Sequence, residues 1–213
     1  MSVHLRPEEI EAESFRIIDA EVGAHPWSSA EWPVVRRVIH TSADFDYARS
    51  MFFSANAVAK GMDALRHGRG IVTDTTMALS GIAKYRLERF GIRSACFVAD
   101  GDVAAAAHEA GVTRSIMAMR KAAADPANGV FVIGNAPTAL FELLRLVREE
   151  TFRPNLIIGL PVGFVGAAES KDRLIFEASE MGMPFITNRG RKGGSNVAAA
   201  VVNALLLLAE EMR

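Results

Sequence analysis

A histidine in the N-terminal third of the chain is the side chain best suited to proton chemistry. His40 closes an apolar helical pattern that begins near Pro33, and it opens the polar segment "HTSAD". Histidine exchanges protons near neutral pH, and a helix C-terminus favours the charged imidazole. Such a group can serve as a general acid or base, although a simple capping histidine is the alternative explanation. The residues alone therefore make His40 a candidate catalytic residue.

Motifs for metals and nucleotides are missing from the sequence. The other four histidines are scattered, and none stands at a metal-binding spacing from another histidine, a cysteine or a carboxylate. The stretch "GLPVGFVG" spaces its glycines as G-x-x-x-G-x-x-G, which matches neither a dinucleotide fingerprint nor a Walker loop. We therefore expect no metal and no cofactor. Gly163 and Gly166 instead indicate backbone that lies close to a packed helix or to a ligand.

Three turns favour the binding of an acidic ligand. "GNAPTALF", "GAAESKD" and "KGGSNVAAA" each place a helix start after an apolar run, with Pro137 in one first turn and Ser195 as the N-cap of another. Free backbone N–H groups at such starts attract anions. In a chain of formal net charge −1, clustered basic side chains would suit several carboxylates or phosphates, with a solvated charged rim as the alternative. The basic residues near these turns and other polar boundaries are Arg114, Lys171, Arg189, Arg191 and Lys192.

Length and composition predict one globular domain spanning residues 1–213. Half of the 213 residues are hydrophobic, and 24 Lys and Arg nearly balance 25 Asp and Glu, which argues against a nucleic-acid or membrane-surface binder. The single Cys96 excludes a disulfide framework and fits a reducing cytoplasm. "MSVHLRPEEIEAESF" lacks a signal-peptide pattern, and the apolar tract 197–209 is too short to span a membrane. We expect a cytoplasmic protein.

Five apolar runs after Gly68 alternate with helical patterns. They are "GIVTD", "IRSACFVAD", "GVFVIGN", "NLIIGLP" and "PFITN". Continuous apolar runs are typical of strands covered on both faces, so we predict an α/β fold with three layers. A mainly parallel sheet of about five strands should lie between helices, with the ligand at the carboxyl ends of the strands.

The first third of the chain is predicted to be entirely helical. One helix begins at Pro7, a second begins near Pro33, and apolar spacing predicts a long third helix over 47–65. Ser14 lies on the apolar face of the first helix. Its hydroxyl either bonds a carbonyl of its own helix or points at a ligand, and both possibilities stay open.

Six stretches together resemble the precorrin-8X methylmutase family, the isomerases of corrin-ring formation in cobalamin biosynthesis. They are "ESFRIIDAE", "VIHTSADFD", "TRSIMAMR", "GNAPTALFELL", "GLPVGFVGAAESK" and "RGRKGGSNVAAA". The resemblance runs in order along nearly the whole chain. It implies an α/β homodimer with active sites near the subunit interface, and His40 as catalytic acid or base.

The resemblance also suggests which side chains meet the substrate. Arg114 and Ser115 belong to its "TRS" motif, while Thr73, Asp74 and Met77 rest mainly on their position after a strand. Lys171 is expected to meet a carboxylate arm. The full set of predicted substrate contacts is Ser14, Thr73, Asp74, Met77, Arg114, Ser115, Asn135 and Lys171.

The implied reaction moves a methyl group from ring carbon eleven to twelve of precorrin-8X, giving hydrogenobyrinic acid. This rearrangement within one molecule needs no redox cofactor, and a well-placed imidazole could assist it by protonating or hydrogen-bonding a ring nitrogen. Two alternatives remain at this stage: the cobalt-precorrin-8 substrate of the anaerobic route, or a non-catalytic corrinoid carrier. The expected partners are a polycarboxylate tetrapyrrole, a second copy of the chain, and neighbouring pathway enzymes that receive the product.

Overall fold

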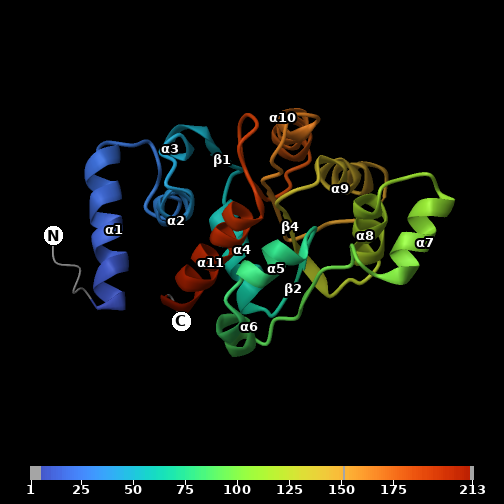
Figure 1. The fold of residues 1–213 in the computed structure, drawn as a ribbon, viewed down its shortest axis with the longest axis horizontal. Coiled ribbons are helices and arrows are strands. Elements are labelled where there is room, and N and C mark those ends of the chain that lie inside the picture. Colours follow the sequence, from blue (N-terminus) through green and yellow to red (C-terminus); the bar gives the residue numbers. More distant parts are fainter. Residues whose placement is uncertain (1–5, 151, 212–213) are drawn as a thin grey trace.

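The computed structural model describes residues 6–150 and 152–211. Strands and helices alternate along most of the chain (Figure 1). The helices are α1 (Pro7–Val22), α2 (Trp32–Ser42), α3 (Tyr47–Ser50), α4 (Ala57–Arg66), α5 (Thr76–Gly81), α6 (Lys84–Phe90), α7 (Gly101–Glu109), α8 (Arg114–Ala123), α9 (Pro137–Glu149), α10 (Ala167–Arg173) and α11 (Ser195–Glu211), with the π-helix η1 (Leu174–Ala178) continuing α10. The strands are β1 (Met51–Phe53), β2 (Gly70–Thr73), β3 (Ser94–Ala95), β4 (Asn128–Ile133), β5 (Leu156–Gly159) and β6 (Phe185–Asn188).

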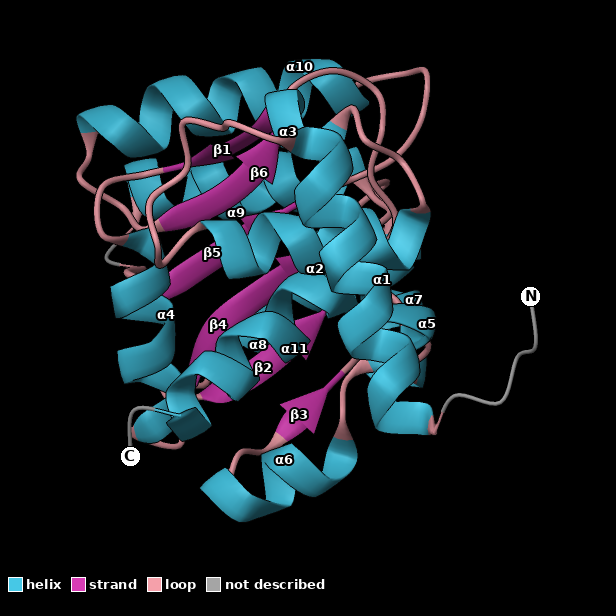
Figure 2. Ribbon diagram, turned by 90° about the vertical axis from the view of Figure 1, so that its left-hand side faces the viewer, coloured by secondary structure: helices cyan, strands magenta, loops and turns pink. Residues whose placement is uncertain are grey.

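These strands form one sheet in the order β1-β6-β5-β4-β2-β3. Figure 2 shows them from β1 at the top to β3 at the bottom. The five strands from β6 to β3 are parallel, and β1 alone runs antiparallel, beside β6. The prediction of a mainly parallel sheet between helices is confirmed, and β1 is a strand that the pattern did not reveal.

Side chains of each inner strand point alternately to two separate cores. In β4, Val130 and Val132 join a cluster with α2, α4 and α11, whereas Phe131 and Ile133 join a cluster with α8, α9 and η1. All four side chains are fully buried. Burying each of them contributes roughly 1.5–3 kcal/mol, so helices on both faces are needed to stabilise the sheet. This two-sided burial explains the continuous apolar runs in the sequence.

Helix α11 is buried along most of its length, as the apolar tract 197–209 predicted. It packs against α2, α4 and α5, and its small residues allow close approach. Gly81 illustrates this, because a Cβ added there would lie 2.9 Å from the Cβ of Ala199. Among the described helices, none is long and apolar enough to cross a membrane.

The long helix predicted over 47–65 is wrong. The chain instead forms α3, then β1, and then α4, with Asn56 in the left-handed region at φ 60° just before α4. The run "MFF" of β1 pairs with β6, and Phe185 donates its backbone N–H to Ser54 Oγ at 2.8 Å. Pairing with a strand more than 130 residues away therefore outweighed the local helical spacing.

Candidate functional site

Asp74, at the carboxyl end of β2, fixes the turn between β4 and α9. Its carboxylate accepts backbone N–H groups from Gly134, Asn135 and Ala136 at 2.9, 2.8 and 2.7 Å. Burial raises the pKa of Asp74, although the three hydrogen bonds act in the opposite direction. Both carboxylate oxygens are thus used inside the protein. This geometry suits a positioning role for Asp74 better than the predicted contact with substrate. The turn that Asp74 holds leaves the side chain of Asn135 exposed.

Thr73 is also buried and bonded internally. Its hydroxyl donates to the carbonyl of Thr75 at 2.9 Å, and the Thr75 hydroxyl lies 2.8 Å from that of Ser195. Gly134 approaches the same place so closely that an added Cβ would lie 2.7 Å from Ser195 Cα. Ser195, predicted as an N-cap, is the first residue of α11. The ends of β2 and β4 are therefore locked against the start of α11.

The loop after β5 presents apolar side chains to solvent. Phe164 and Val165 are 84% and 90% exposed, and Val162 is also exposed. The Arg191 guanidinium lies over the Phe164 ring, 5.6 Å from its centroid. Met77, a predicted contact after β2, is 71% exposed. Unpaired apolar surface next to cationic groups suits a ligand that combines a large ring with acidic arms.

The two glycines of this loop have a different role from close packing. Gly163 and Gly166 have φ of +145° and +78°, a region that other residues rarely adopt. At Gly163, no described atom lies within 4 Å of an added Cβ. At Gly166, the atom nearest to an added Cβ is Pro137 Cβ, at 3.4 Å. The packed-helix explanation is therefore wrong for Gly163, where backbone conformation is the reason for glycine.

Lys171 lies inside the protein rather than at its surface. The fully buried ammonium donates to Asn188 Oδ1 at 3.1 Å and to the Lys192 carbonyl at 2.6 Å. Burial lowers the pKa of Lys171 to about 8. The predicted contact with a carboxylate arm would require this ammonium to leave both acceptors. In this structure Lys171 instead connects α10 to the loop after β6.

His40 and Ser14 line the same hollow. This hollow has a volume of about 230 Å³ and lies between α1, α2 and the turn after α2, with Ile17 and Phe45 also on its wall. The His40 imidazole is exposed and meets the Phe15 ring edge-on at 5.3 Å between centroids. The Ser14 hydroxyl donates to the Ile10 carbonyl at 2.8 Å, which still leaves its oxygen able to accept a hydrogen bond.

A second hollow connects the end of α2 to the carboxyl edge of the sheet. It has a volume of about 330 Å³, and its wall includes Thr41, Val162, Lys192 and Asn196. Lys192 Nζ contacts Asp44 Oδ2 at 2.6 Å and Asp46 Oδ2 at 2.6 Å, which ties the loop after β6 to the turn after α2. Sequence reasoning missed Thr41 and Asn196, although both lie within motifs of the family resemblance.

Arg114 and Ser115 begin α8 on the other side of the molecule from α2 (Figure 1). Thr113, the N-cap of α8, donates its hydroxyl to that of Thr138 at 3.2 Å, so the start of α8 lies beside the start of α9 and near exposed Asn135. Among the described residues, no hydrogen bond or common cavity joins this group to His40 and Ser14. The predicted site thus falls into two parts.

Fold and site together define a class: an α/β protein with an exposed imidazole and an apolar, cation-flanked loop at the ligand edge of its sheet. The family model for precorrin-8X methylmutase matches residues 9–208. The chain belongs to this family, whose members are isomerases, and it is therefore itself an isomerase of cobalamin biosynthesis. Described residues include no cluster of three or more side chains suited to hold a metal.

Relatives of known sequence and structure agree along nearly the full chain. The cobalt-precorrin-8 methylmutases of Priestia megaterium and Salmonella typhimurium are 47% and 48% identical, covering 97% and 94% of this chain and 90% and 95% of theirs. The precorrin-8X methylmutase of Pseudomonas aeruginosa is 42% identical and covers 91% of each chain. The solved precorrin-8x methyl mutase of Thermus thermophilus superposes with a TM-score of 0.86 at 39% identity, covering 95% of this chain and 98% of that one.

Proposed function

We propose that the protein moves a methyl group from ring carbon eleven to twelve of precorrin-8X, with His40 as the proton donor or acceptor. The observation that carries this proposal is the exposed His40 imidazole, which shares a hollow with Ser14 in a chain matched to the family over residues 9–208. The migration redistributes electrons around one conjugated ring. An imidazole that protonates or hydrogen-bonds a ring nitrogen would draw electron density toward it and lower the barrier.

The loop after β5 is the proposed platform for the macrocycle. Val162, Phe164 and Val165 offer apolar surface that a flat ring would cover. Arg191 stands next to this surface, because its guanidinium group lies over the Phe164 ring, while Arg189 lies over the ring of Phe52 in β1. Arginine forks hydrogen-bond carboxylates in pairs, so they would receive the acetate and propionate arms. Arg114 and Asn135 would reach arms on another side of the ring.

A homodimer would bring further surface to this site. Helix α1 packs on α2 and carries exposed Ile10 and Ile17, which are 47% and 42% exposed. Phe45 is exposed beside the His40 hollow. Apolar side chains at the mouth of a site are a reason to expect a covering partner, and a second copy related by two-fold symmetry is the simplest one. The proposed active sites then lie near the subunit interface.

The metal-free ring and its cobalt form are both candidate substrates. The relatives carry both names, so similarity to them favours neither ring. Turnover of the purified protein on precorrin-8X and on cobalt-precorrin-8, followed by visible absorption, decides between them. We expect faster conversion of the natural substrate. Conversion of neither ring would contradict the proposal.

The open edge of the site would also allow transfer of the product to neighbouring enzymes. We place the protein and these enzymes in the cytoplasm.

A further inference from the structure

A third cavity lies at the opposite, amino-terminal edge of the sheet. It has a volume of about 560 Å³ and is formed beside Asn128, which begins β4, and Leu146, near the end of α9. This volume lies in the usual range of roughly 300–1,000 Å³ for small-molecule sites. The proposed reaction has no use for this cavity, because His40 and the apolar loop lie elsewhere. Its wall contains four arginines, Arg69, Arg120, Arg145 and Arg153.

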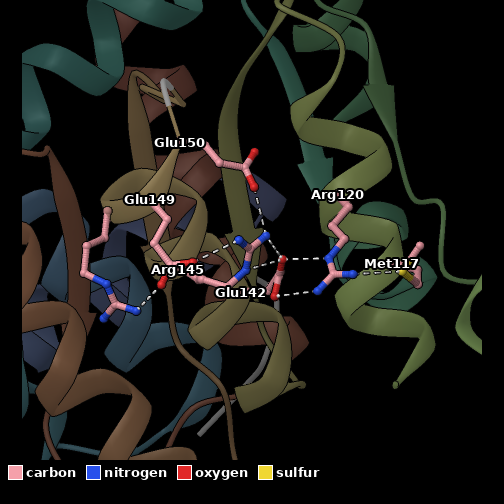
Figure 3. Close-up of polar contacts among 7 residues, drawn as sticks. Met117, Arg120, Glu142, Arg145, Glu149 and Glu150 are labelled. Atoms are coloured by element: carbon pink, nitrogen blue, oxygen red, sulfur yellow. Dashed lines mark hydrogen bonds and ion pairs between the residues drawn. The ribbon is translucent and has the colours of Figure 1, made fainter. Parts of the chain in front are cut away.

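Two of the four arginines, Arg120 and Arg145, are ion-paired to the carboxylate of Glu142 (Figure 3). Glu142 Oε1 accepts from Arg120 Nε at 2.8 Å and from Arg145 Nη2 at 2.6 Å. Burial acts to raise the pKa of Glu142, but the hydrogen bonds from Arg145 and Arg120 outweigh it and hold this pKa below its ordinary value. Arg145 also pairs with Glu150 at 3.1 Å. The positive charges of Arg120 and Arg145 are therefore largely balanced by Glu142 and Glu150.

Arg69 and Arg153 are different, because their described partners are uncharged. Arg69 donates to Asn155 Oδ1 at 3.0 Å and to the Pro126 carbonyl at 2.5 Å. Arg153 donates through Nη1 to the carbonyls of Val147 and Phe152, both at 2.7 Å. Carbonyl and amide oxygens orient a guanidinium without cancelling its charge. Within 6–150 and 152–211, no carboxylate is ion-paired to either arginine, and Arg69 Nη1 and Arg153 Nε and Nη2 keep free donors.

The two carboxylates on the cavity wall do not supply this missing charge. Glu150 pairs with Arg145, and Asp125 Oδ2 lies 3.6 Å from Arg93 Nη2. Two oriented, unneutralised guanidinium groups therefore share a hollow in a protein of formal net charge −1. Planar, pre-oriented arginine donors match the oxygens of carboxylates and phosphates.

We propose that this cavity binds a small oxyanion, a compound with at least two carboxylate or phosphate charges, through Arg69 and Arg153. Leu146 and Phe152 supply apolar wall for the rest of the molecule. Because the cavity is separate from the His40 hollow, such a ligand would bind without blocking the proposed reaction.

The test is titration calorimetry of the full chain with pyrophosphate and with citrate, at 150 mM salt. We expect saturable binding of one ligand per chain to at least one of them, and the preferred one identifies phosphate or carboxylate chemistry. Binding should weaken at least tenfold in Arg69→Gln. Lys60→Gln removes the same charge from an exposed position on α4 and should leave affinity within twofold. Absence of saturable binding, or equal loss in both variants, overturns the proposal.

A second measurement uses the wild-type protein and does not depend on the folding of any variant. Phenylglyoxal modifies accessible arginines, and mass spectrometry of the wild-type protein identifies the modified positions. The preferred anion should slow modification of Arg69 and Arg153 at least fivefold, while exposed Arg16 on α1 keeps its rate. Equal modification with and without the anion contradicts the proposal. Both readouts measure binding, so their failure would leave the proposed methyl migration untouched.

Discussion

Exposure separates the candidate residues into those that can reach a ligand and those that hold loops in place. His40, Arg114 and Asn135 have side chains open to solvent. Asp74 and Lys171 are buried and hydrogen-bonded to neighbouring turns. Replacing a residue of the second kind should therefore change stability, and under the proposed function it should also change turnover.

Replacing His40 with alanine should reduce turnover of the tetrapyrrole by roughly 10²–10⁴, the usual contribution of a general acid or base. The exposed side chain makes few packing contacts, so the free energy of unfolding should change by less than about 0.5 kcal/mol. Steady-state absorption assays and urea unfolding measure the two effects. His67→Ala, which removes another exposed histidine, serves as the control. Equal turnover by both variants would show that His40 is not the catalytic group.

Asp74→Asn should lower the free energy of unfolding by about 1–3 kcal/mol. The amide has one acceptor oxygen for three backbone N–H groups and turns an N–H₂ group toward the others. Asp63→Asn changes an exposed carboxylate and should be nearly neutral. Urea unfolding at pH 7 provides the comparison. A loss no larger than that of the control would mean that the turn does not depend on Asp74.

The sequence predicted polar residues for the candidate site but not their surroundings. His40 could be placed because a helix end and a polar motif are local features. The burial of Asp74 and Lys171 could not, because it depends on turns 60 and 17 residues further along the chain. A basic or acidic residue at a strand end looks the same in sequence whether it faces solvent or a neighbouring loop.

At the scale of elements, the loop after β5 and the loop after β6 lie against each other at the carboxyl edge of the sheet. Gly193 lies so close to this first loop that an added Cβ would clash with the Leu160 carbonyl. The Gly194 N–H donates to the same carbonyl at 2.9 Å. The position of each loop therefore depends on the other.

Phe164→Ala should raise KM for the tetrapyrrole about tenfold, because a buried aromatic contact with the ring would be lost. The side chain is 84% exposed in the free protein, so unfolding free energy should stay within about 0.5 kcal/mol. Phe176→Ala removes another exposed phenylalanine, from η1, and is the matched control. An unchanged KM in Phe164→Ala would remove this loop from the substrate site.

The pH dependence of stability should reveal buried Lys171. Its pKa falls from the ordinary 10.5 to about 8 on folding, so between these values the unfolded chain holds the extra proton. The free energy of unfolding therefore rises with pH across this window, by at most about 1.4 kcal/mol per pH unit, and this gain is lost as pH falls through 8. Guanidinium unfolding from pH 7.5 to 10 should show the rise in wild type and in Lys60→Met but not in Lys171→Met. If stability changed with pH in the same way in all three proteins, the rise would not come from Lys171.

Periodicity predicted the inner strands and the edge strand β3, and it failed at the other edge strand, β1. The runs that became β2, β4, β5 and β6 are buried on both faces, so their composition alone reveals them. β1 has three residues and lies in a stretch whose apolar spacing also fits a helix. This segment is a strand because it pairs with β6, and a local sequence pattern cannot reveal that pairing.

At the scale of the whole molecule, we propose one domain over residues 1–213, because both cores share a single sheet.

We also propose a dimer that covers α1. Ile17→Glu places a charge on this surface and should weaken dimerisation at least tenfold, with little change in monomer stability. Analytical ultracentrifugation measures dimerisation, and Tyr85→Glu, at an exposed position of α6, is the control. Wild-type protein that sediments as a monomer at micromolar concentration would contradict the dimer.

The central claim is catalysis at His40, and one absorption experiment tests it most directly. Precorrin-8X is mixed with one hundredth of an equivalent of wild-type protein or of His40→Ala, and the visible spectrum is followed to completion. We predict full conversion to hydrogenobyrinic acid by the wild type and conversion at least a hundredfold slower by the variant. A spectral change that stops at one hundredth of the substrate, or equal rates for both proteins, would contradict it.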